Sequence, residues 1–427
     1  MSDSAVTAPN PLAPKRPLLM PLAQALESLL TAAEATLPPE PVTTMDADGR
    51  VLAQDVVSAL QVPAWDNSAM DGYAVRCAEV SEPGAVLPVL QRIAAGEAGK
   101  ALQALTAARI FTGAPVPAGA DAVVMQEDCT VVNACEGGVR INVAPTPGQN
   151  IRRAGEDVRK DAVVLQKGER ITPAVQGLVA SLGLNSVLVA RRARVALFST
   201  GDELVMPGDV APQDMRPGAI YNSNRFFLAS LLRRMGCEVS DFGIVPDNRE
   251  ATVSALRDAA QGHDVILTSG GVSVGEEDHI KPAVQQLGSL DLWQIAIKPG
   301  KPFAYGLVNR TDGSPCHFLG LPGNPVSSFV TFLVLVRPFL LRLQGQRDVA
   351  MKKVAVRADF AWAKADNRQE FLRVRRNSNG GLDLFPNQSS GVLTSTVWGD
   401  GVVDNPGGRT IAVGDMVEFI AFSDLLA

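Results

Sequence analysis

Apolar segments alternate with helical patterns between residues 194 and 341, and this alternation constrains the fold more than any other sequence feature. Short apolar segments lie at 195–198 and 265–267, and helical patterns cover 224–235 and 250–260. Strands that alternate with helices at this spacing predict a parallel sheet with crossover helices. Ligands of such sheets bind beyond the carboxyl ends of the strands. We therefore expect an α/β domain here, with any site in the loops that follow its strands.

The rest of the chain follows other patterns. Helical patterns at 22–37 and 172–182 flank a stretch rich in Gly, Pro and short β-branched runs, and this stretch is typical of a small β-rich domain. We expect the two helical pieces to form one discontinuous domain around that insert. Turn signals after residue 345 indicate a small β-barrel or sandwich. In chain order, the expected parts are a mobile tail (1–17), a helical domain (18–57 and 152–190), a β-rich domain (58–151), the α/β domain (191–345) and a β-barrel (346–427).

Composition excludes several classes of protein. The chain has 427 residues, of which 46% are hydrophobic and 20% charged, so it can build sizeable cores and is not a disordered chain. Its formal net charge of −6 lacks the positive field of a nucleic-acid coat. We expect no nucleic-acid partner, although a local cationic pocket for a small anion remains compatible with this charge.

Cysteine and histidine usage argues against a disulfide framework or a histidine-rich metal centre. The five cysteines are never spaced as Cys-x-x-Cys, and the chain has three histidines. The most apolar stretch, 326–341, is interrupted by Arg337-Pro338 and is shorter than the roughly 20 residues that span a bilayer. We expect a cytoplasmic protein with no membrane partner, in which this stretch forms a buried helix.

Two glycine-containing loops follow strands of the α/β domain, at 199–203 and 268–278. Glycines let the backbone approach a ligand closely, and turn N–H groups with Ser and Thr hydroxyls can hold an anion. Neither loop matches the P-loop or the dinucleotide fingerprint, so ordinary strand-to-helix connections remain an alternative. The candidate anion-binding residues are Ser199, Thr200, Gly201, Ser269, Gly270, Gly271, Ser273 and Gly275.

Carboxylates crowd the same loops. Glu203, Asp247 and Asp278 all lie near the ends of expected strands, and their oxygens could together hold Mg²⁺ beside a bound phosphate. The alternative for Asp247 and Asp278 is that each caps the N-terminus of the helix that follows it.

Three further segments stand out. Residues 66–74 read Asp-Asn-Ser-Ala-Met-Asp-Gly-Tyr-Ala, either a functional loop or a tight turn capped by Asx side chains, and 111–117 form a rigid Gly/Pro loop. Lys298 and Lys301 lie among prolines after an expected strand, and 320–325 precedes a helix. The lysines could bind an oxyanion as point charges or could be solvated turn residues. The residues alone therefore indicate an enzyme acting on a phosphorylated small molecule with Mg²⁺ and a second anionic substrate.

Together these segments resemble the MoeA family of molybdopterin molybdenumtransferases, which is similar to the E domain of gephyrin. The resemblance runs from about Leu22 to the C-terminus. It rests on seven segments in family order: 66–74, 111–117, 148–157, 198–204, 268–278, 298–302 and 320–327.

The resemblance implies a homodimer of four-domain subunits. Domain I is formed by the helical pieces and domain II by the β-rich insert. Domain III is the molybdopterin-binding, MogA-like α/β domain, and domain IV is the barrel. The implied activity inserts molybdate into adenylylated molybdopterin, releases AMP and forms molybdenum cofactor with Mg²⁺. Transient contacts with the molybdopterin adenylyltransferase and with proteins that mature molybdoenzymes are also implied.

The resemblance also implies roles for individual residues. Asp71 and Thr112 would reach the active site from domain II of one subunit, and Glu203, Asp247 and Asp278 from domain III of the other. Glu203 and Asp278 would place Mg²⁺, and the loop from Ser269 to Gly275 would hold the pterin phosphate. The remaining implied substrate-binding residues are Lys298, Arg373 and Ser390, which would form the molybdate pocket, together with Lys301 and Pro322.

Two positions depart from the family pattern. Gln294 stands where family members often carry a lysine, and His279 where an aromatic residue is common. A scaffold protein, a carrier that binds molybdopterin without chemistry, and a relative that handles tungstate remain as alternatives. The acidic loop residues that the enzyme needs are present, and they favour the enzyme.

Overall fold

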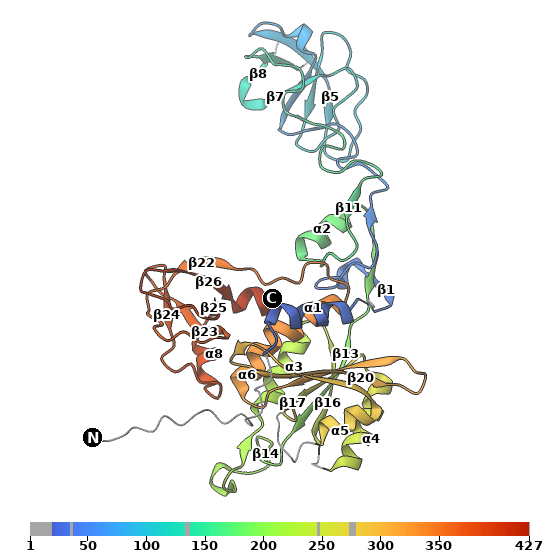
Figure 1. Cartoon of the computed structure of the whole chain (residues 1–427). Helices are drawn as coiled ribbons and strands as arrows, with labels where there is room; N and C mark the ends of the chain where they lie inside the picture. The colour runs from blue at the N-terminus through green and yellow to red at the C-terminus, as the bar shows by residue number, and fades with distance from the viewer. Residues whose placement is uncertain (1–18, 35–36, 133–136, 246–247, 273–278, 427) are drawn as a thin grey trace, which may run out of the picture. The chain divides into compact units, whose positions relative to one another are not determined.

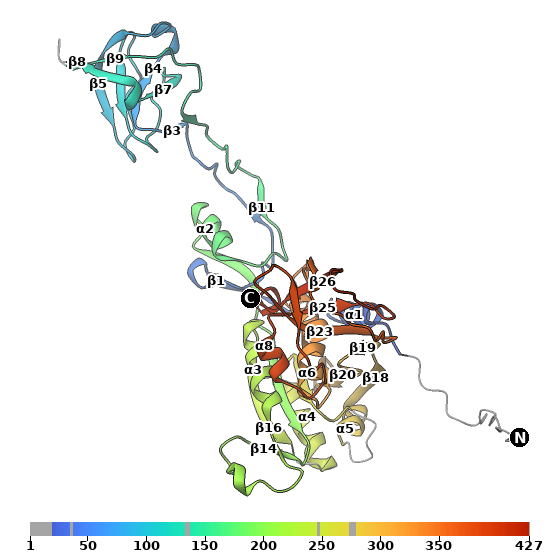
Figure 2. The same cartoon turned by 90° about the vertical axis from the view of Figure 1, so that its left-hand side faces the viewer.

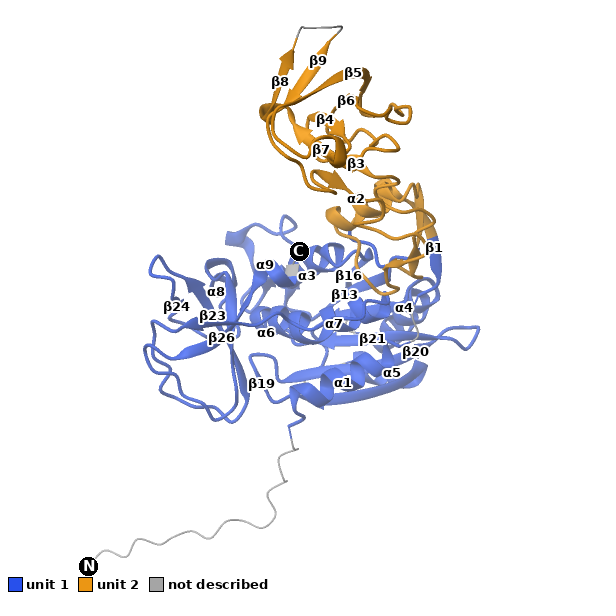
Figure 3. Cartoon of the chain, turned by 90° about the horizontal axis from the view of Figure 1, so that it is seen from above, with its two compact units in different colours: residues 1–40, 49–51, 189–427 blue, residues 41–48, 52–188 orange. Residues whose placement is uncertain are grey.

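The computed structural model describes residues 19–34, 37–132, 137–245, 248–272 and 279–426 (Figure 1). The chain divides into two compact units, which Figure 3 colours separately. Unit 1 comprises residues 1–40, 49–51 and 189–427, and unit 2 comprises residues 41–48 and 52–188. Among the predicted site residues, Asp247, Ser273, Gly275 and Asp278 lie outside the described residues.

A six-stranded sheet forms the centre of unit 1, with the order β16-β13-β17-β21-β20-β18. The first four strands are parallel, and β20 and β18 are antiparallel to their neighbours. The bounds are β13 (Arg194–Thr200), β16 (Glu238–Val245), β17 (Val265–Ser269), β18 (Gly288–Gln294), β20 (Pro302–Asn309) and β21 (Pro315–Leu321). The prediction of a wholly parallel sheet is therefore wrong at one edge. A short turn, 310–314, joins β20 directly to β21 there, so no crossover helix is possible.

Helices cover both faces of this sheet (Figure 1 and Figure 2). Side chains of β13 alternate between two cores, because Val195 and Leu197 join one and Ala196 and Phe198 the other. On the first face lie α1 (Leu22–Ala32), α3 (Ser223–Arg234), α6 (Pro325–Thr331), the π-helix η5 (Phe332–Val336) and α7 (Arg337–Leu343); on the second lie α4 (Arg249–Gly262) and α5 (Ile280–Leu287). The α/β organisation is as expected, although α1 ends five residues earlier than its pattern predicts.

The stretch 326–341, which Arg337-Pro338 interrupts in the sequence, lies in one continuous helix over Pro325–Leu343. Pro338 occupies the first turn of α7, directly after the π-helical segment, where the missing N–H is tolerated. The continuous helix of 19 residues has a mean hydropathy of 1.7 and is long and apolar enough to span a bilayer, but 83% of its apolar window is buried inside the protein. It serves as a central core helix of unit 1, as predicted.

A second sheet of unit 1 joins the C-terminal segment to the strand β19 (Ile297–Lys298). Its order is β19-β23-β25-β26-β22, with β24 beside β23. The bounds are β22 (Val354–Arg357), β23 (Gln369–Arg376), β24 (Leu382–Leu384), β25 (Gly401–Asn405) and β26 (Met416–Ala421), with the helices α8 (Thr394–Trp398) and α9 (Phe422–Leu426). This sheet has its own hydrophobic core, which includes Leu372, Val374 and Phe419. A closed barrel stays a prediction, because the described strand order does not return to its start.

Unit 2 contains a six-stranded sheet with the order β7-β4-β6-β5-β9-β8. Its strands are β4 (Gly72–Val75), β5 (Ala85–Ile93), β6 (Ala107–Ile110), β7 (Ala122–Met125), β8 (Cys129–Val132) and β9 (Gly138–Ile141). The helix α2 (Pro173–Ser181) begins where Thr172 Oγ1 accepts a hydrogen bond from the Val175 N–H at 3.3 Å. Because α1 belongs to unit 1 and α2 to unit 2, a common domain for the two helices remains a prediction.

Short elements complete the fold. The short strands are β1 (Pro39–Thr43), β2 (Val56–Val57), β3 (Asn67–Ser68), β10 (Ile151–Arg152), β11 (Val163–Leu165), β12 (Ser186–Ala190), β14 (Leu204–Val205) and β15 (Ile220–Tyr221). The short 3₁₀ helices are η1 (Thr44–Asp46), η2 (Cys77–Glu79), η3 (Gln126–Asp128) and η4 (Pro212–Asp214).

Candidate functional site

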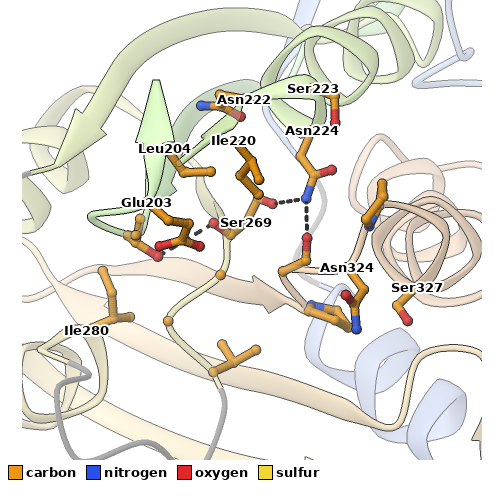
Figure 4. A pocket seen from close by; sticks show the side chains of 18 of the residues that line it. Glu203, Leu204, Ile220, Asn222, Ser223, Asn224, Ser269, Ile280, Asn324 and Ser327 are labelled. Atoms are coloured by element: carbon orange, nitrogen blue, oxygen red, sulfur yellow. Dashed lines mark hydrogen bonds between the residues drawn. The ribbon is translucent and has the colours of Figure 1, made fainter. Parts of the chain in front are cut away.

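A cavity of about 760 Å³ opens in unit 1 at the carboxyl ends of β13 and β17 (Figure 4). This is the edge of the sheet at which the strand order predicts a ligand. The predicted residues that line it are Thr200, Gly201, Glu203, Ser269, Gly270, Gly271 and Pro322. Ser199 is not among them: its hydroxyl is buried and lacks a hydrogen-bond partner within the described part of the chain.

Two of the loop glycines are required by close backbone approach. Gly270 has a φ of +92°, and a Cβ placed on it would lie 2.7 Å from the carbonyl oxygen of Thr200. A Cβ on Gly201 would lie 2.5 Å from Glu203 Oε2. Larger residues would therefore push the two loops apart or displace the Glu203 carboxylate from the cavity wall.

Sequence reasoning missed one whole wall of the cavity, the N-terminus of α3 with the strand β15 before it. The lining residues there are Ile220, Tyr221, Asn222, Ser223 and Asn224. A capping signal was available, because Asn222 precedes the helix and its Oδ1 accepts a hydrogen bond from the Arg225 N–H at 3.2 Å. Asn324 and Ser327, at the start of α6, were also missed as individual lining residues.

Glu203 is the predicted metal-binding carboxylate that lies in the described part of the cavity. No group of three His, Cys, Asp or Glu residues suited to a metal occurs among the described residues. The helix-cap alternatives for Asp247 and Asp278 stay predictions, because both residues lie outside the described part of the chain. Asn248 caps α4, its Oδ1 accepting from the N–H groups of Glu250 and Ala251, and His279 occupies the N-cap position of α5.

The predicted pair Asp71 and Thr112 lies together on unit 2. Asp71 Oδ1 accepts hydrogen bonds from the backbone N–H of Thr112 at 2.8 Å and from its hydroxyl at 2.7 Å. The backbone bond first, and then the hydroxyl bond, hold the pKa of the Asp71 carboxyl below its usual range. A charged carboxylate and a hydroxyl are thus presented at one exposed point, 41 residues apart in sequence.

Three of the segments that carry the family resemblance meet around this pair. Asp66 accepts from the Ala154 N–H at 2.8 Å and from Arg153 Nη1 at 2.6 Å, and β3 pairs with β10. The Gly113 N–H donates to the Ser68 carbonyl at 2.8 Å. Residues 66–74, 111–117 and 148–157 therefore fold into one cluster of loops, beyond the isolated Asx turn considered from the sequence.

Lys298 lies beside carboxylates of the C-terminal sheet. Its Nζ donates to Glu370 Oε1 at 2.9 Å and lies 3.4 Å from Asp366 Oδ2. Glu370 is 1% exposed and also accepts a hydrogen bond from Trp362 Nε1 at 2.7 Å. Lys301 is exposed, and its carbonyl accepts from the Ile295 N–H. Neither lysine belongs to the cavity lining.

Arg373 is 1% exposed, and burial lowers the pKa of its guanidinium to about 10. It donates to Ser395 Oγ at 3.2 Å and to the carbonyls of Phe371 and Ser389 at 3.0 and 3.4 Å. Within the described residues, no carboxylate pairs with it. It is thus a buried cation held by neutral oxygen acceptors.

The segment that follows Ser389 links Arg373 to the cavity. The Ser390 carbonyl accepts from the Val326 N–H at 2.9 Å, and Gly391 lines the cavity. Glu370 and Arg373 are three residues apart in β23, so their side chains lie on opposite faces of that strand. The structure therefore brings Arg373 and Ser390 together but places Lys298, the partner of Glu370, on the other face.

The chain is a multidomain α/β protein. Helices cover both faces of its central sheet, a loop-lined cavity opens at the strand ends, and two further six-stranded β-sheets complete it. Family models match the chain in order: "MoeA N-terminal region (domain I and II)" over residues 20–183, "Probable molybdopterin binding domain" over 196–342, and "MoeA C-terminal region (domain IV)" over 355–422. The chain belongs to the MoeA family. It is an enzyme of the molybdopterin molybdenumtransferase type, which acts in molybdenum cofactor biosynthesis.

Named relatives support this placement. The molybdopterin molybdenumtransferase of Haemophilus influenzae is 40% identical over 354 residues, which are 80% of this chain and 85% of the relative. The molybdopterin molybdenumtransferase 2 of Mycobacterium tuberculosis is 42% identical over 327 residues, 73% of this chain and 76% of the relative. A crystal structure of the molybdopterin biosynthesis protein moeA from Pyrococcus horikoshii OT3 superposes with a TM-score of 0.79 at 26% identity, covering 95% of this chain and 100% of that one.

Proposed function

We propose that the protein inserts molybdate into adenylylated molybdopterin, releasing AMP, in a Mg²⁺-dependent reaction. The active site is a cleft between domain III of one subunit and domain II of the other in a homodimer. The observation that carries the proposal is the cavity at the strand ends of a MoeA-family chain, lined by Ser269, Gly270, Gly271 and Glu203. Backbone and hydroxyl donors suit a phosphate-bearing substrate at this position.

The charge of the cavity supports a substrate that arrives with a cation. No lysine or arginine occurs among the described lining residues, whereas Glu203 does. In the proposal Glu203 holds Mg²⁺ together with Asp278. Mg²⁺, when bound, supplies positive charge to the phosphate oxygens. Of these two carboxylates, Glu203 lies among the described residues and Asp278 does not. The full set of Mg²⁺ ligands is therefore part of the proposal.

The exposed Asp71 and Thr112 pair is the proposed contribution of domain II. The hydrogen bonds from Thr112 hold the Asp71 carboxylate in one orientation and keep it charged. In the proposal this carboxylate reaches the anhydride of the substrate that is bound to domain III of the other subunit. Asp247 belongs to that domain III. Mg²⁺, when bound, would neutralise the negative charge of the anhydride, and this neutralisation would do more for AMP release than a single strong base.

Arg373 and Ser390 are the proposed molybdate-binding residues, and Lys298, whose side chain lies on the other face of β23, is proposed with Lys301 as a substrate-binding cation outside that pair. Arg373 supports this role best, because it is buried, charged and paired with no described carboxylate. Transient contacts with the adenylyltransferase that supplies the substrate, and with maturation proteins that accept the product, complete the proposal.

Mixing two inactive variants tests the arrangement of the site. D71A and E203Q should each fail to release AMP, since each lacks one half of every site. When equal amounts of the two variants exchange subunits at random, about half of the dimers are mixed. Each mixed dimer carries one intact site of two, so about a quarter of wild-type AMP release should return. Exchange verified by differently tagged subunits, without any recovered activity, would overturn the cross-subunit site.

A further inference from the structure

Asn224 joins two loops of the cavity lining, which follow the neighbouring parallel strands β17 and β21 (Figure 4). It is the second residue of α3, lines the cavity and is 9% exposed. Its side chain is not needed to cap α3, because Asn222 performs that role. A polar side chain in this position must therefore be explained by its own contacts.

Both hydrogens of the Asn224 amide are used. Nδ2 donates to Ser269 Oγ at 2.8 Å and to the Gly323 carbonyl oxygen at 2.7 Å. A carbonyl oxygen can only accept, so the atom that faces Gly323 must be the nitrogen, and this fixes the orientation of the amide. The orientation in turn makes Ser269 Oγ the acceptor of the second bond.

This direction determines what Ser269 can offer to a ligand. A serine hydroxyl has one proton to donate, and its lone pairs accept. Because Asn224 occupies an acceptor position on Oγ, the proton remains available, and no described residue accepts it. Ser269 is 4% exposed and lines the cavity beside Gly270 and Gly271.

We propose that Asn224 is a positioning residue that makes Ser269 a dedicated hydrogen-bond donor to an anionic phosphate oxygen of the bound substrate. This inference rests on the proposed function, which places a phosphate-bearing substrate in the cavity. A hydroxyl without such a partner can rotate to donate elsewhere, and it would then present its lone pairs to an anion. The same amide holds the Gly323 loop at a fixed distance from Ser269.

The test compares N224D with the wild-type protein in binding adenylylated molybdopterin, with Mg²⁺ and without molybdate, by calorimetry. The introduced carboxylate has the same shape but can donate to neither partner, and it accepts the Ser269 proton. We expect binding at least about tenfold weaker, the size expected when a hydrogen bond to a charged group is lost. The ratio of the N224D dissociation constant to the wild-type dissociation constant should shrink as the pH falls toward about 4–5, where the introduced carboxyl takes up a proton.

Controls separate positioning from folding. N309D makes the same chemical change at the exposed far end of β20 and should bind like the wild type. The double variant N224A/S269A should lose less affinity than the sum of the losses in N224A and S269A, since Asn224 acts mainly through Ser269. Equal binding by N224D and wild type, or additive losses in the double variant, overturns this inference alone. Failure of the wild-type protein to bind the substrate overturns the proposed function and this inference with it.

Discussion

Lys298 and Glu370 tie the α/β domain to the C-terminal sheet. They are register partners in the parallel pairing of β19 with β23, and Lys298 Nζ donates to Glu370 Oε1 at 2.9 Å. Glu370 is almost fully buried, while the Lys298 side chain is 37% exposed. A lysine that already neutralises a buried carboxylate is a weaker anion site than a free lysine, and this pair therefore acts first as a structural link.

Removing Lys298 should destabilise the protein. Among the described residues, K298A leaves the Glu370 carboxylate buried with the Trp362 indole as its other hydrogen-bond partner. We expect a loss of about 1–3 kcal/mol in the free energy of unfolding, less than for fully buried pairs because Lys298 reaches solvent. K298A/E370Q should regain most of the loss. Urea unfolding measures both. If K298A is as stable as the wild type, the link is not structural.

The Asp71 and Thr112 pair predicts graded losses of activity. D71A should abolish AMP release with the thermal unfolding midpoint unchanged, because the residue is exposed at a loop. T112V removes one of the two hydrogen bonds to Asp71 and keeps the backbone bond, so AMP release should fall by about tenfold. Since these bonds lower the Asp71 pKa, activity between pH 5 and 8 should show no titration of this carboxyl. An acid limb of AMP release in that range that moves to higher pH in T112V, which lacks one of these bonds, would contradict the assignment.

His317 predicts a pH-dependent stability of unit 1. Its ring packs against the ring of Phe339, with 5.1 Å between the ring centroids, and Tyr305 Oη lies 3.0 Å from its Nδ1. Burial lowers the pKa of His317 to about 4, so the unfolded chain, with a pKa near 6.5, binds a proton that the folded protein does not. Stability is therefore present above pH 6.5 and is lost as the pH falls toward 4, by up to about 3 kcal/mol.

The comparison that checks this pH dependence is H317Q, whose amide oxygen can still accept from Tyr305. Urea unfolding at pH 7 and pH 5 should show a smaller difference for H317Q than for the wild type. Equal pH dependence in the two proteins would assign the effect to other groups.

Arg373 predicts a separation of binding from stability. R373M removes a buried charge whose desolvation opposes folding, but it also removes the hydrogen bonds to Ser395, Phe371 and Ser389. Because these two contributions oppose each other, the free energy of unfolding should change by no more than about 1 kcal/mol. Its affinity for molybdate, measured by calorimetry, should fall at least about tenfold. Wild-type affinity in R373M would exclude Arg373 from the oxyanion pocket.

Local signals in the sequence identified the α/β core and the loops of the cavity. Apolar runs and glycines after strands are sufficient to place Thr200, Gly201 and Ser269 at one sheet edge, because parallel strands end on the same side. The strand β20 was missed because Pro302 begins it and the chain reverses without a helix. A segment with no crossover carries no βαβ pattern to detect.

Long-range contacts explain the remaining misses. Glu370 lies 72 residues from Lys298, and nothing near either residue indicates their pairing. Asn224 reads as an ordinary residue at the start of a helix, and its role depends on Ser269, 45 residues away, and on Gly323. Alternation along β23 also separates Lys298 from Arg373, which the family resemblance placed in one pocket.

The most direct test of the central claim is the release of AMP from adenylylated molybdopterin by the 427-residue protein, with Mg²⁺, in the presence and absence of molybdate. The account predicts that AMP release depends on molybdate, that active molybdenum cofactor forms in equal amount, and that D71A releases none. Tight binding of the substrate with no AMP release in either condition would contradict it and would identify a carrier or scaffold, with Gln294 as the first residue to replace by lysine.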